Sequence, residues 1–415
     1  MKNEFKIADI NLAPEGRRRI EWAWEYMPVL SLIAEKESAN QPLSGLVVGT
    51  CLHLEAKTAC LLKVLHDLGA VVVTAGSNPL STQDPICAAL VEDGIHVFSW
   101  HGMNSEEYSE NIKEMLDWDP QVIIDDGGDV VSMVAEHRRD LIPSILGGCE
   151  ETTTGIKRLQ AMDREGVLPF PMLAVNDAQS KHLFDNRYGT GQSVWDAILR
   201  TTNLVVAGKR VVVAGYGWCG KGASRRAAGL GARVIVVEVD PHRALEAHMD
   251  GFDVMDMNEA AKAGDVFITV TGDTRVIRRE HFEKMKDGVL LCNAGHFDVE
   301  VSVSDLKEMA VEVKASRQNI DTYIMADGRR LHLLGEGRLV NLAAGDGHPV
   351  EIMDLSFAMQ LLSCLYISRN KLARGLYNVP AELDRQIAEY KLESLGITIE
   401  KLTLEQEEYL ASWRE

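Results

Sequence analysis

VVVAGYGWCGKG, residues 211–222, is the stretch that decides how half of this chain folds. It places Gly215, Gly217 and Gly220 in the spacing G-x-G-x-x-G, directly after an apolar run and before the helical pattern ASRRAAGLGA. Glycines at this spacing permit a tight turn and let a pyrophosphate approach the backbone at the N-terminus of a helix. The context predicts a dinucleotide-binding α/β domain, and a glycine-rich turn without a ligand is the alternative.

The acidic residue that follows this loop indicates which dinucleotide binds. Glu238 ends the next apolar run, ARVIVVEVD, where a carboxylate accepts hydrogen bonds from the adenosine ribose hydroxyls. A carboxylate at this place repels a 2′-phosphate, so the sequence favours NAD over NADP. Arg243 follows shortly and is the residue that could offset this repulsion.

Apolar β-rich runs alternate with amphipathic segments on both sides of the loop, which is typical of parallel α/β sheets. We expect two doubly wound parallel-sheet domains with the Rossmann domain inserted into the chain. The predicted boundaries are 1–186 for a substrate-binding domain, 187–346 for the NAD domain, and 347–415 for a helical segment at the first domain and a subunit interface. The runs are GLVVGT, AVVVTAG, IHVFSW, QVIIDDGG and MLAVND, then ARVIVVEVD, GDVFITVTGD and GVLLCNAGH, continuing to GRLVNLAAGDGHP.

Composition limits the possible partners and location. The 415 residues carry a formal charge of −19, which would repel nucleic acid and anionic membranes and leaves a small molecule as the expected partner. No run resembles a signal peptide or a membrane span, so we expect a cytoplasmic protein. The seven cysteines include no C-x-x-C pair, so we expect neither a structural metal nor a disulfide framework.

Four polar clusters lie near expected strand ends, and each has a structural explanation besides a chemical one. IIDDGGD ends a strand where parallel sheets bind ligands, but alone it could be a metal site, a base or a solvated turn. GGCEETTTG surrounds a helix start, where a hydroxyl cap and a ribose-binding set remain equally open. Lys181 and Asp185 have the spacing of a surface helix pair, and His296 alone would more often be structural.

As an ordered set, these motifs resemble the S-adenosyl-L-homocysteine hydrolase family over almost the whole chain. The resemblance implies a two-lobed fold, tightly bound NAD and a homotetramer. It also implies a redox-neutral, reversible reaction in which NAD⁺ oxidises the ribose 3′-hydroxyl, the 4′ proton leaves, and homocysteine is exchanged for water at carbon 5′. The motifs are STQDP, IDDGGD, EETTTG, VNDAQSKHLFDN, VVAGYGWCGKG, CNAGHFDVE and GEGRLVNL with GHP.

The resemblance also assigns roles. Lys181 and Asp185 match the pair that polarises and deprotonates the 3′-hydroxyl, and Asn186 orients them. Asp126 and His53 match the groups for proton transfer at carbon 4′ and at the leaving group. The remaining matches are His296, which reaches the ribose from the cofactor domain; Glu151, Thr152 and His348 for substrate; and Thr152, Thr153, Thr154, Asn293 and Asn341, with Gly215, Gly217, Gly220 and Glu238, for NAD.

The chemistry makes a demand on these groups. A lysine that acts near neutral pH must have its pKa lowered by burial or by neighbouring charge, and two adjacent carboxylates push their pKa values apart. We expect the cluster of Asp126, Glu151, Lys181 and Asp185 both to lower the pKa of the lysine and to separate the pKa values of its carboxylates.

The stretch GTCLHLEAKTACLL, residues 49–62, departs from the usual family pattern of His, Met, Thr, any residue, then Glu or Gln. Here the pattern reads His53, Leu54, Glu55, Ala56 and Lys57. In an extended segment residues 53, 55 and 57 share one face toward the purine. Lys57 can only donate and suits the 6-oxygen of hypoxanthine, whereas ionised Glu55 can only accept and suits N1–H.

We therefore predict S-inosyl-L-homocysteine as the substrate, and a branch of the family with this pair has been linked to it. The alternative is that Glu55 and Lys57 pair at the pocket rim and leave S-adenosyl-L-homocysteine as the substrate. A second departure is the ending YLASWRE, where most relatives carry a Lys- and Tyr-bearing tail that reaches the neighbouring subunit's NAD.

Two other classes of protein share features of this sequence. A dehydrogenase of the 2-hydroxyacid type would explain the glycine loop but would not need EETTTG with SKHLFDN. A non-enzymatic nucleotide-binding regulator would be expected to lose some of Lys181, Asp185, Asp126 and His296, all of which are present.

Overall fold

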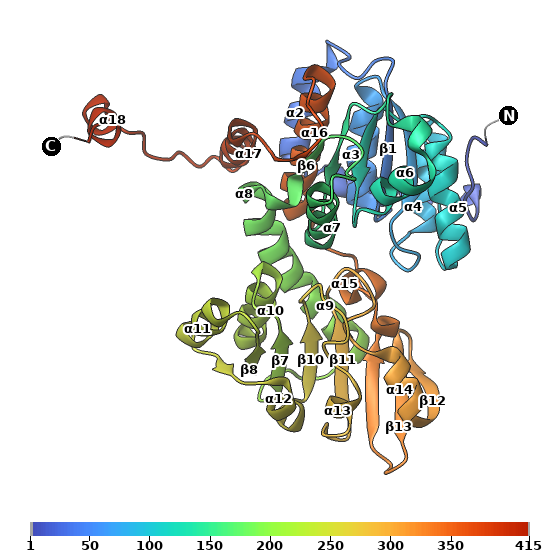
Figure 1. Ribbon diagram of the computed structural model, residues 1–415, viewed down its shortest axis with the longest axis vertical. Coiled ribbons are helices and arrows are strands. Elements are labelled where there is room, and N and C mark those ends of the chain that lie inside the picture. Colours follow the sequence, from blue (N-terminus) through green and yellow to red (C-terminus); the bar gives the residue numbers. More distant parts are fainter. Residues whose placement is uncertain (1–2, 414–415) are drawn as a thin grey trace.

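The first of two sheets has seven parallel strands in the order β15-β6-β5-β4-β1-β2-β3. The computed structural model describes residues 3–413, and Figure 1 shows this sheet in its upper lobe. The strands are β1 (Val47–Leu52), β2 (Val71–Gly76), β3 (His96–Phe98), β4 (Val122–Asp125), β5 (Gly147–Glu150), β6 (Met172–Ala174) and β15 (Leu376–Asn378).

Helices cover both faces of this sheet, which explains why its strands are apolar on both sides. One face packs against α1 to α4 and the other against α5 to α7, and two separate clusters of buried side chains result. The helices are α1 (Ala13–Trp24), α2 (Pro28–Ser38), α3 (Ala56–Asp67), α4 (Asp84–Glu92), α5 (Ser105–Leu116), α6 (Asp129–His137) and α7 (Thr153–Arg164), with 3₁₀ turns η1 (Ile10–Leu12), η2 (Arg139–Leu141) and η3 (Val175–Asp177).

The second sheet has eight strands in the order β12-β13-β14-β11-β10-β7-β8-β9. Along β7, Val211 and Val213 join the core under α9 to α11, while Val212 and Ala214 join the core under α12 to α14. The strands are β7 (Arg210–Ala214), β8 (Arg233–Val237), β9 (Asp253–Val254), β10 (Val266–Thr269), β11 (Val289–Asn293), β12 (Ala310–Arg317), β13 (Ile320–Met325) and β14 (Arg330–Leu334).

The helices of this second lobe alternate with its strands as the sequence predicted, and the doubly wound fold class is confirmed. They are α10 (Trp218–Gly229), α11 (Pro241–Met249), α12 (Met257–Ala263), α13 (Arg279–Phe282), α14 (Val303–Met309), the turn η5 (Gly335–Gly337) and α15 (Val340–Ala343).

One expectation about this lobe was wrong. The stretch GRLVNLAAGDGHP does not continue the strand pattern, because it forms part of η5 and α15. The last strands are instead β12 to β14, and β12 and β13 run antiparallel as a hairpin at the edge of the sheet. β12 is exposed along most of its length, so its residues lack the apolar run that marks the buried strands.

Three consecutive helices link the lobes: α8 (Gln179–Lys181), the π-helix η4 (His182–Gly189) and α9 (Thr190–Thr202). The helix after the glycine loop packs tightly on this link, since a Cβ on Gly222 would lie 1.8 Å from the carbonyl oxygen of Arg187. A π-helix is rare and often marks a functional site.

After α15 the chain returns to the first lobe through α16 (Val350–Arg369), as Figure 1 shows. This helix is long and apolar enough to span a membrane by composition, but most of it is buried against the first sheet, as in the core helix of a folded domain. Its Asp354 accepts hydrogen bonds from the backbone N–H groups of Val29 and Leu30 and forms an ion pair with Lys391.

The rest of the chain is not purely helical, because β15 adds an edge strand to the first sheet. α17 (Ala381–Ser394) packs against α2 and α16. α18 (Leu404–Ala411) extends away from both lobes in Figure 1. Of the ending YLASWRE, Arg414 and Glu415 lie outside the described residues.

The strand order of both sheets positions the site. In each, the first strand of the lobe, β1 or β7, lies beside the fourth, β4 or β10, so that the winding reverses between them. Ligands of open α/β sheets bind at the carboxyl ends of strands beside such a reversal. The residues that follow β1, β4, β7 and β10 all line one cavity between the lobes.

Candidate active site

The cavity measures about 810 Å³, within the range of small-molecule sites. It collects residues from both lobes and from the return to α16. Gly220 and Asn293 do not line it. The residues proposed from the sequence that line it are His53, Glu55, Lys57, Asp126, Glu151, Thr152, Thr153, Thr154, Lys181, Asp185, Asn186, Gly215, Gly217, Glu238, His296, Asn341 and His348.

The glycine-rich loop turns from β7 into α10 at one end of this cavity. Gly215 has a φ of +102°, a conformation that a side chain would strain. A Cβ on Gly220 would lie 2.0 Å from the carbonyl oxygen of Gly215, so only glycine permits this packing. Gly217 precedes α10 and has no side chain to cap it, which leaves the first N–H groups of the helix available to a pyrophosphate.

Glu238 lies beside this loop, as a ribose-binding acid should. Its carboxylate accepts backbone hydrogen bonds from Tyr216 at 2.6 Å, Val239 at 2.7 Å and Asp240 at 3.1 Å. A carboxylate has about four acceptor positions, so one remains for a ribose hydroxyl. Arg243 also lines the cavity.

Two buried polar atoms test whether a nicotinamide nucleotide fits the other end. Among residues 3–413, the Oγ1 atom of Thr154 and the Oδ1 atom of Asn341 have no hydrogen-bond partner. Such atoms are costly to leave unpaired, and these two belong to residues that line the cavity. A ribose hydroxyl and a carboxamide are groups that would satisfy them, so the residues present fit NAD.

Asn293 lies behind the cavity and holds the loop that carries His296. Its Nδ2 atom donates to the carbonyl oxygens of Gly295, Phe297 and Gly337, at 2.8–3.1 Å. Its Oδ1 atom accepts from the backbone N–H of Gly295 at 2.8 Å. The side chain is therefore engaged in positioning the protein loop.

We call Lys181, Asp185, Glu151 and His348 the hinge cluster, because it gathers around the linking helices. Lys181 Nζ lies 3.1 Å from Asp185 Oδ2 and 3.3 Å from Glu151 Oε1. Its third contact is the Oδ1 atom of Asn186, at 2.9 Å. Nδ1 of His348 contacts Asp185 directly. Lys181 and Asp185 are almost fully buried, which excludes the reading of a surface helix pair.

The electrostatics of this cluster differ from what the sequence suggested. Burial opposes the charge of Lys181, but the carboxylates of Asp185 and Glu151 outweigh it and raise the lysine pKa. Burial would raise the pKa of Asp185, yet Lys181 and His348 hold it well below its usual range. Burial raises the pKa of Glu151 to about 7, although Lys181 opposes this shift. Lys181 is therefore a fixed cation, and Glu151 is the group that titrates near neutral pH.

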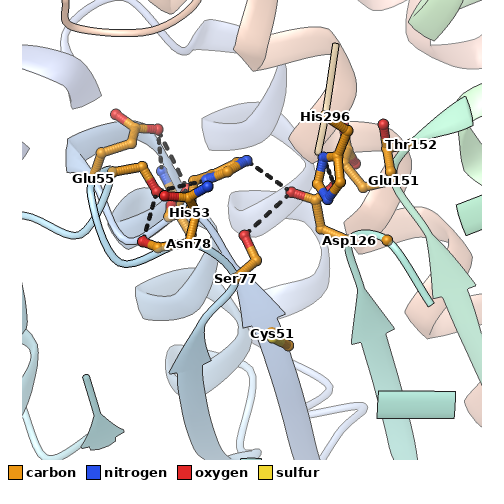
Figure 2. Close-up of polar contacts among 12 residues, drawn as sticks. Cys51, His53, Glu55, Ser77, Asn78, Asp126, Glu151, Thr152 and His296 are labelled. Carbon is orange, nitrogen blue, oxygen red and sulfur yellow. Dashed lines mark hydrogen bonds and ion pairs between the residues drawn. The ribbon is translucent and has the colours of Figure 1, made fainter. Parts of the chain in front are cut away.

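We call His53, Asp126 and His296 the histidine cluster. Figure 2 shows Asp126 between the two rings, and the dashed contact joins it to His53. His53 Nε2 lies 3.2 Å from Asp126 Oδ2, and His296 Nδ1 lies 3.7 Å from Asp126 Oδ1. Ser77 donates to Asp126 at 3.4 Å. The donor atoms of the three lie within 4.8 Å of one another, a spacing that can hold a metal ion or pass a proton.

The histidine cluster joins the two lobes. His53 and Asp126 follow β1 and β4, whereas His296 follows β11 of the second lobe. Gly127 makes this approach possible: its φ is +115°, and a Cβ there would lie 2.8 Å from His296 Nε2. Burial lowers the pKa of His53 to about 4, so its ring is neutral near pH 7.

Comparison with known proteins identifies this arrangement. Residues 186–347 match the description "S-adenosyl-L-homocysteine hydrolase, NAD binding domain", and residues 4–143 match "S-adenosyl-L-homocysteine hydrolase". The adenosylhomocysteinase of Thermococcus kodakarensis is 58% identical over 99% of this chain and 98% of its own length.

The chain belongs to the S-adenosyl-L-homocysteine hydrolase family. It is therefore an NAD-dependent hydrolase that acts on a thioether, and NAD is its cofactor.

Other relatives carry a different substrate in their names. The S-inosyl-L-homocysteine hydrolase of Methanopyrus kandleri is 55% identical over 100% of this chain and 98% of its own length. That of Methanocaldococcus jannaschii is 54% identical over 99% of both chains. Sequence identity to these relatives therefore does not decide whether the substrate of this enzyme carries adenine or hypoxanthine.

The segment in which this family member departs from the usual pattern is not extended throughout, contrary to expectation. α3 begins at Ala56, so Lys57 lies in its first turn. Glu55 caps the helix and accepts backbone hydrogen bonds from Lys57 at 3.0 Å and Thr58 at 3.2 Å. Lys57 Nζ lies 2.9 Å from Glu55 Oε2 and donates to the carbonyl of Asp346 at 2.6 Å. Both side chains are buried and line the cavity all the same.

A threonine hydroxyl cap does not account for the helix start at EETTTG. Thr152 is at the N-cap but its hydroxyl makes no cap bond among the described residues. Glu150 instead accepts the backbone N–H groups of Thr152 at 3.0 Å and Gly127 at 2.9 Å. This buried acid connects the loops after β4 and β5.

Several residues that support the family's site were missed because they come from distant segments. Ser356 donates to Asp185 at 2.7 Å, and Gln360 donates to Glu151. Both lie on α16, and polar residues inside so apolar a helix were the signal that could have revealed them. Ser81, from the motif STQDP, contacts His53.

Proposed function

We propose that this enzyme hydrolyses S-inosyl-L-homocysteine reversibly to inosine and L-homocysteine, through a 3′-keto nucleoside. The same reaction on S-adenosyl-L-homocysteine is the alternative. The observation that carries the choice is Lys57, a buried cation in the cavity wall that can donate a hydrogen bond but cannot accept one.

The hinge cluster suits the 3′-hydroxyl. Bound NAD⁺ supplies a hydride acceptor, which makes the oxidation of that carbon reversible. Lys181, held as a cation by two carboxylates, would stabilise negative charge on the 3′ oxygen. Glu151 is the adjacent acceptor for the hydroxyl proton, because its pKa of about 7 is matched to proton transfer near neutral pH, whereas Asp185, whose pKa is held well below its usual range, stays ionised and keeps Lys181 in place. Asn186 orients Lys181 through its 2.9 Å hydrogen bond.

The histidine cluster suits the next steps. A 3′ ketone acidifies the neighbouring 4′ C–H, and Asp126 or the neutral His53 would accept that proton. The C5′–S bond then breaks, the electron pair leaves with sulfur, and the same groups return a proton to the thiolate. Water adds at carbon 5′ by the reverse sequence. Because residues of both lobes line the cavity, closure around the ligand would keep bulk water from the ketone.

The purine would be selected at the start of α3. Two of the three N–H groups of Lys57 Nζ are directed at Glu55 and at the carbonyl oxygen of Asp346, so one remains for a ligand. Glu55 Oε2 receives the backbone and ammonium N–H groups of Lys57, while Oε1 receives the N–H of Thr58. The Thr58 hydroxyl also lies 3.3 Å from Oε1, but its single proton goes to the nearer carbonyl oxygen of His53 at 2.6 Å, so Oε1 keeps an acceptor position. The pair thus offers one donor and one acceptor.

Hypoxanthine fits this pair through its 6-oxygen on Lys57 and its N1–H on Glu55. Adenine fits only with the roles exchanged, its N1 on Lys57 and its amino group on Glu55. Position 57 holds Glu or Gln in the usual family pattern, and either side chain can accept a hydrogen bond from the 6-amino group of adenine. Lys57 can only donate a hydrogen bond. This reversal favours a carbonyl oxygen at position 6. A mismatched buried group costs about 1–3 kcal/mol.

The test is steady-state kinetics with S-inosyl- and S-adenosyl-L-homocysteine on NAD-loaded enzyme, followed by thiol release. We expect the inosyl substrate to have the higher kcat/KM by at least about tenfold. The double variant Glu55→Thr with Lys57→Gln should shift the preference toward adenosyl.

Lys63→Gln is the matched control, since it also removes a lysine from α3 but one that pairs with Asp93 away from the cavity. It should leave the preference unchanged. A wild-type preference for the adenosyl substrate would refute the choice of hypoxanthine and support the exchanged arrangement.

We further propose a cytoplasmic homotetramer whose partner is the nucleoside thioether, without nucleic acid or membrane. The net charge of −19 supports the last two points. Light scattering on purified enzyme tests the assembly, and a monomer would refute it.

A further inference from the structure

His53 has a hydrogen-bond partner on the side away from Asp126. Its Nδ1 atom lies 2.6 Å from the hydroxyl oxygen of Ser81. That hydroxyl in turn lies 3.0 Å from the carbonyl oxygen of Asn78, to which it can donate. Ser81 is buried, and it does not line the cavity. Its hydroxyl therefore acts on the ligand only through the ring of His53.

The protons on this chain of contacts can be counted. Because the ring is neutral near pH 7, it carries one N–H. If Ser81 donates to Asn78, its oxygen accepts from Nδ1–H and Nε2 keeps a lone pair, which faces Asp126 Oδ2 at 3.2 Å and bonds to it only through a proton that the two atoms share. If Ser81 donates to Nδ1 instead, the ring proton is on Nε2, which then cannot accept another. A partner on one ring nitrogen thus decides what the other can do.

Proton transfer at the ligand needs the first arrangement. Nε2 must take up a proton and give it back while the ring passes between neutral and cationic forms. This cycle avoids an imidazolate only if Nδ1 stays protonated throughout. The proton taken from carbon 4′ goes to the Nε2–Asp126 pair, the C–H electron pair forms the C4′=C5′ bond, and the proton passes to sulfur as the C5′–S bond breaks.

We propose that Ser81 is a positioning residue that keeps His53 protonated at Nδ1, with its own hydroxyl proton held by the carbonyl of Asn78. This inference rests on the proposed function, in which His53 takes part in proton transfer. Ser81 has no contact with the hinge cluster, so it should affect elimination and hydration but not oxidation of the 3′ carbon.

Thr82 provides a matched control. Its hydroxyl also donates to the carbonyl of Asn78, at 3.2 Å, and contacts Ser99 at 3.0 Å. It is as buried as Ser81 but makes no hydrogen bond to His53. Thr82→Val therefore perturbs the same turn without removing the partner of Nδ1.

The experiment compares NAD-loaded wild type, Ser81→Ala and Thr82→Val in three assays. Thiol release reports the whole reaction. Absorbance of bound NADH after mixing with inosine reports oxidation alone, and loss of the 4′ proton to D₂O reports proton removal. For Ser81→Ala we expect thiol release and 4′ exchange to fall about 10- to 100-fold, with NADH formation within about twofold of wild type.

Thr82→Val should stay within about twofold in all three assays. An equal fall of all three in Ser81→Ala, or equal effects of the two variants, would show a merely structural role and overturn the inference. Unchanged thiol release in Ser81→Ala would also overturn it. If wild type releases thiol from neither nucleoside, the proposed function itself fails and the inference falls with it.

Discussion

The hinge cluster and the histidine cluster share one cavity but are built in opposite ways. In the hinge cluster, opposite charges touch, with Lys181 3.1 Å from Asp185 and 3.3 Å from Glu151. In the histidine cluster, Asp126 stands between two rings at 3.2 and 3.7 Å, and one ring comes from the other lobe. The first arrangement fixes charge in place, whereas the second leaves room for a proton to move.

This difference has a consequence for how each cluster depends on the fold. Lys181 and Asp185 are adjacent on the linking helices, and α16 adds Ser356 to the same carboxylate. The linking helices therefore supply the central pair of the hinge cluster by themselves, and Glu151 after β5 and His348 before α16 complete it. The histidine cluster exists only where Gly127 and His296 of the two lobes meet, so its geometry depends on how the lobes are placed.

The largest effect should come from removing the central charge of the hinge cluster. Lys181→Met leaves Asp185 and Glu151 buried without their cation, and we expect kcat to fall at least about 1,000-fold. Stability should fall by about 3–5 kcal/mol, because a buried charge pair loses one partner. Thiol release, NADH formation and denaturant unfolding measure these losses.

The control for this variant is the double substitution Lys181→Met with Asp185→Asn. Removing both charges should recover part of the stability without recovering activity. Recovery of activity would mean that the cluster only supports the fold.

The contact between the lobes should give an intermediate effect. In Gly127→Ala the new Cβ would meet His296 Nε2 at 2.8 Å, so we expect thiol release to fall about 100-fold. Gly128→Ala is the matched control: Gly128 also has a positive φ, +77°, but a Cβ there would meet its nearest atoms only at 3.8 Å. Equal losses in both variants would show that backbone strain, rather than the position of His296, is responsible.

The smallest effect should be seen in the pH dependence of kcat, which distinguishes the two clusters because Glu151 and His53 have different pKa values. The pKa of Glu151 is about 7, so kcat should rise about tenfold per pH unit below 7 and level off above it. Glu151→Gln should abolish this limb, whereas His53, with a pKa of about 4, should add no inflection between pH 6 and 9. A limb that persists in Glu151→Gln would assign the titration elsewhere.

Stability gives the same group an independent readout. The folded pKa of Glu151 lies above the usual 4.5, so its contribution is complete below pH 4.5 and is lost as pH rises through 7. Glu151→Gln lacks this loss. The Tm of the variant relative to wild type should therefore be higher at pH 8 than at pH 5.

Much of the molecule could be predicted because its signals are local. The glycine spacing and the strand before it require no distant partner, and VVVA is apolar at every position because helices cover both faces of β7. The edge hairpin β12–β13 was missed for the complementary reason: an exposed strand carries no apolar run.

The site was predicted less completely than the fold. Most of the residues named through the resemblance line the cavity, but Ser356, Gln360 and Ser81 were not named, because their contacts join segments far apart in sequence. The extended backbone expected from His53 to Lys57 was wrong, because α3 already begins at Ala56, but Glu55 and Lys57 line the cavity as expected.

The sequence by itself determined the two α/β lobes, the dinucleotide loop, and the family with its NAD-dependent thioether chemistry. Only the tertiary structure decided that Lys181 is a fixed cation, that Glu55 caps a helix while pairing with Lys57, and that His53 has Ser81 behind it. The physical reason is that hydrogen-bond partners and pKa values depend on which charges and dipoles are near in space, and those neighbours come from separate parts of the chain.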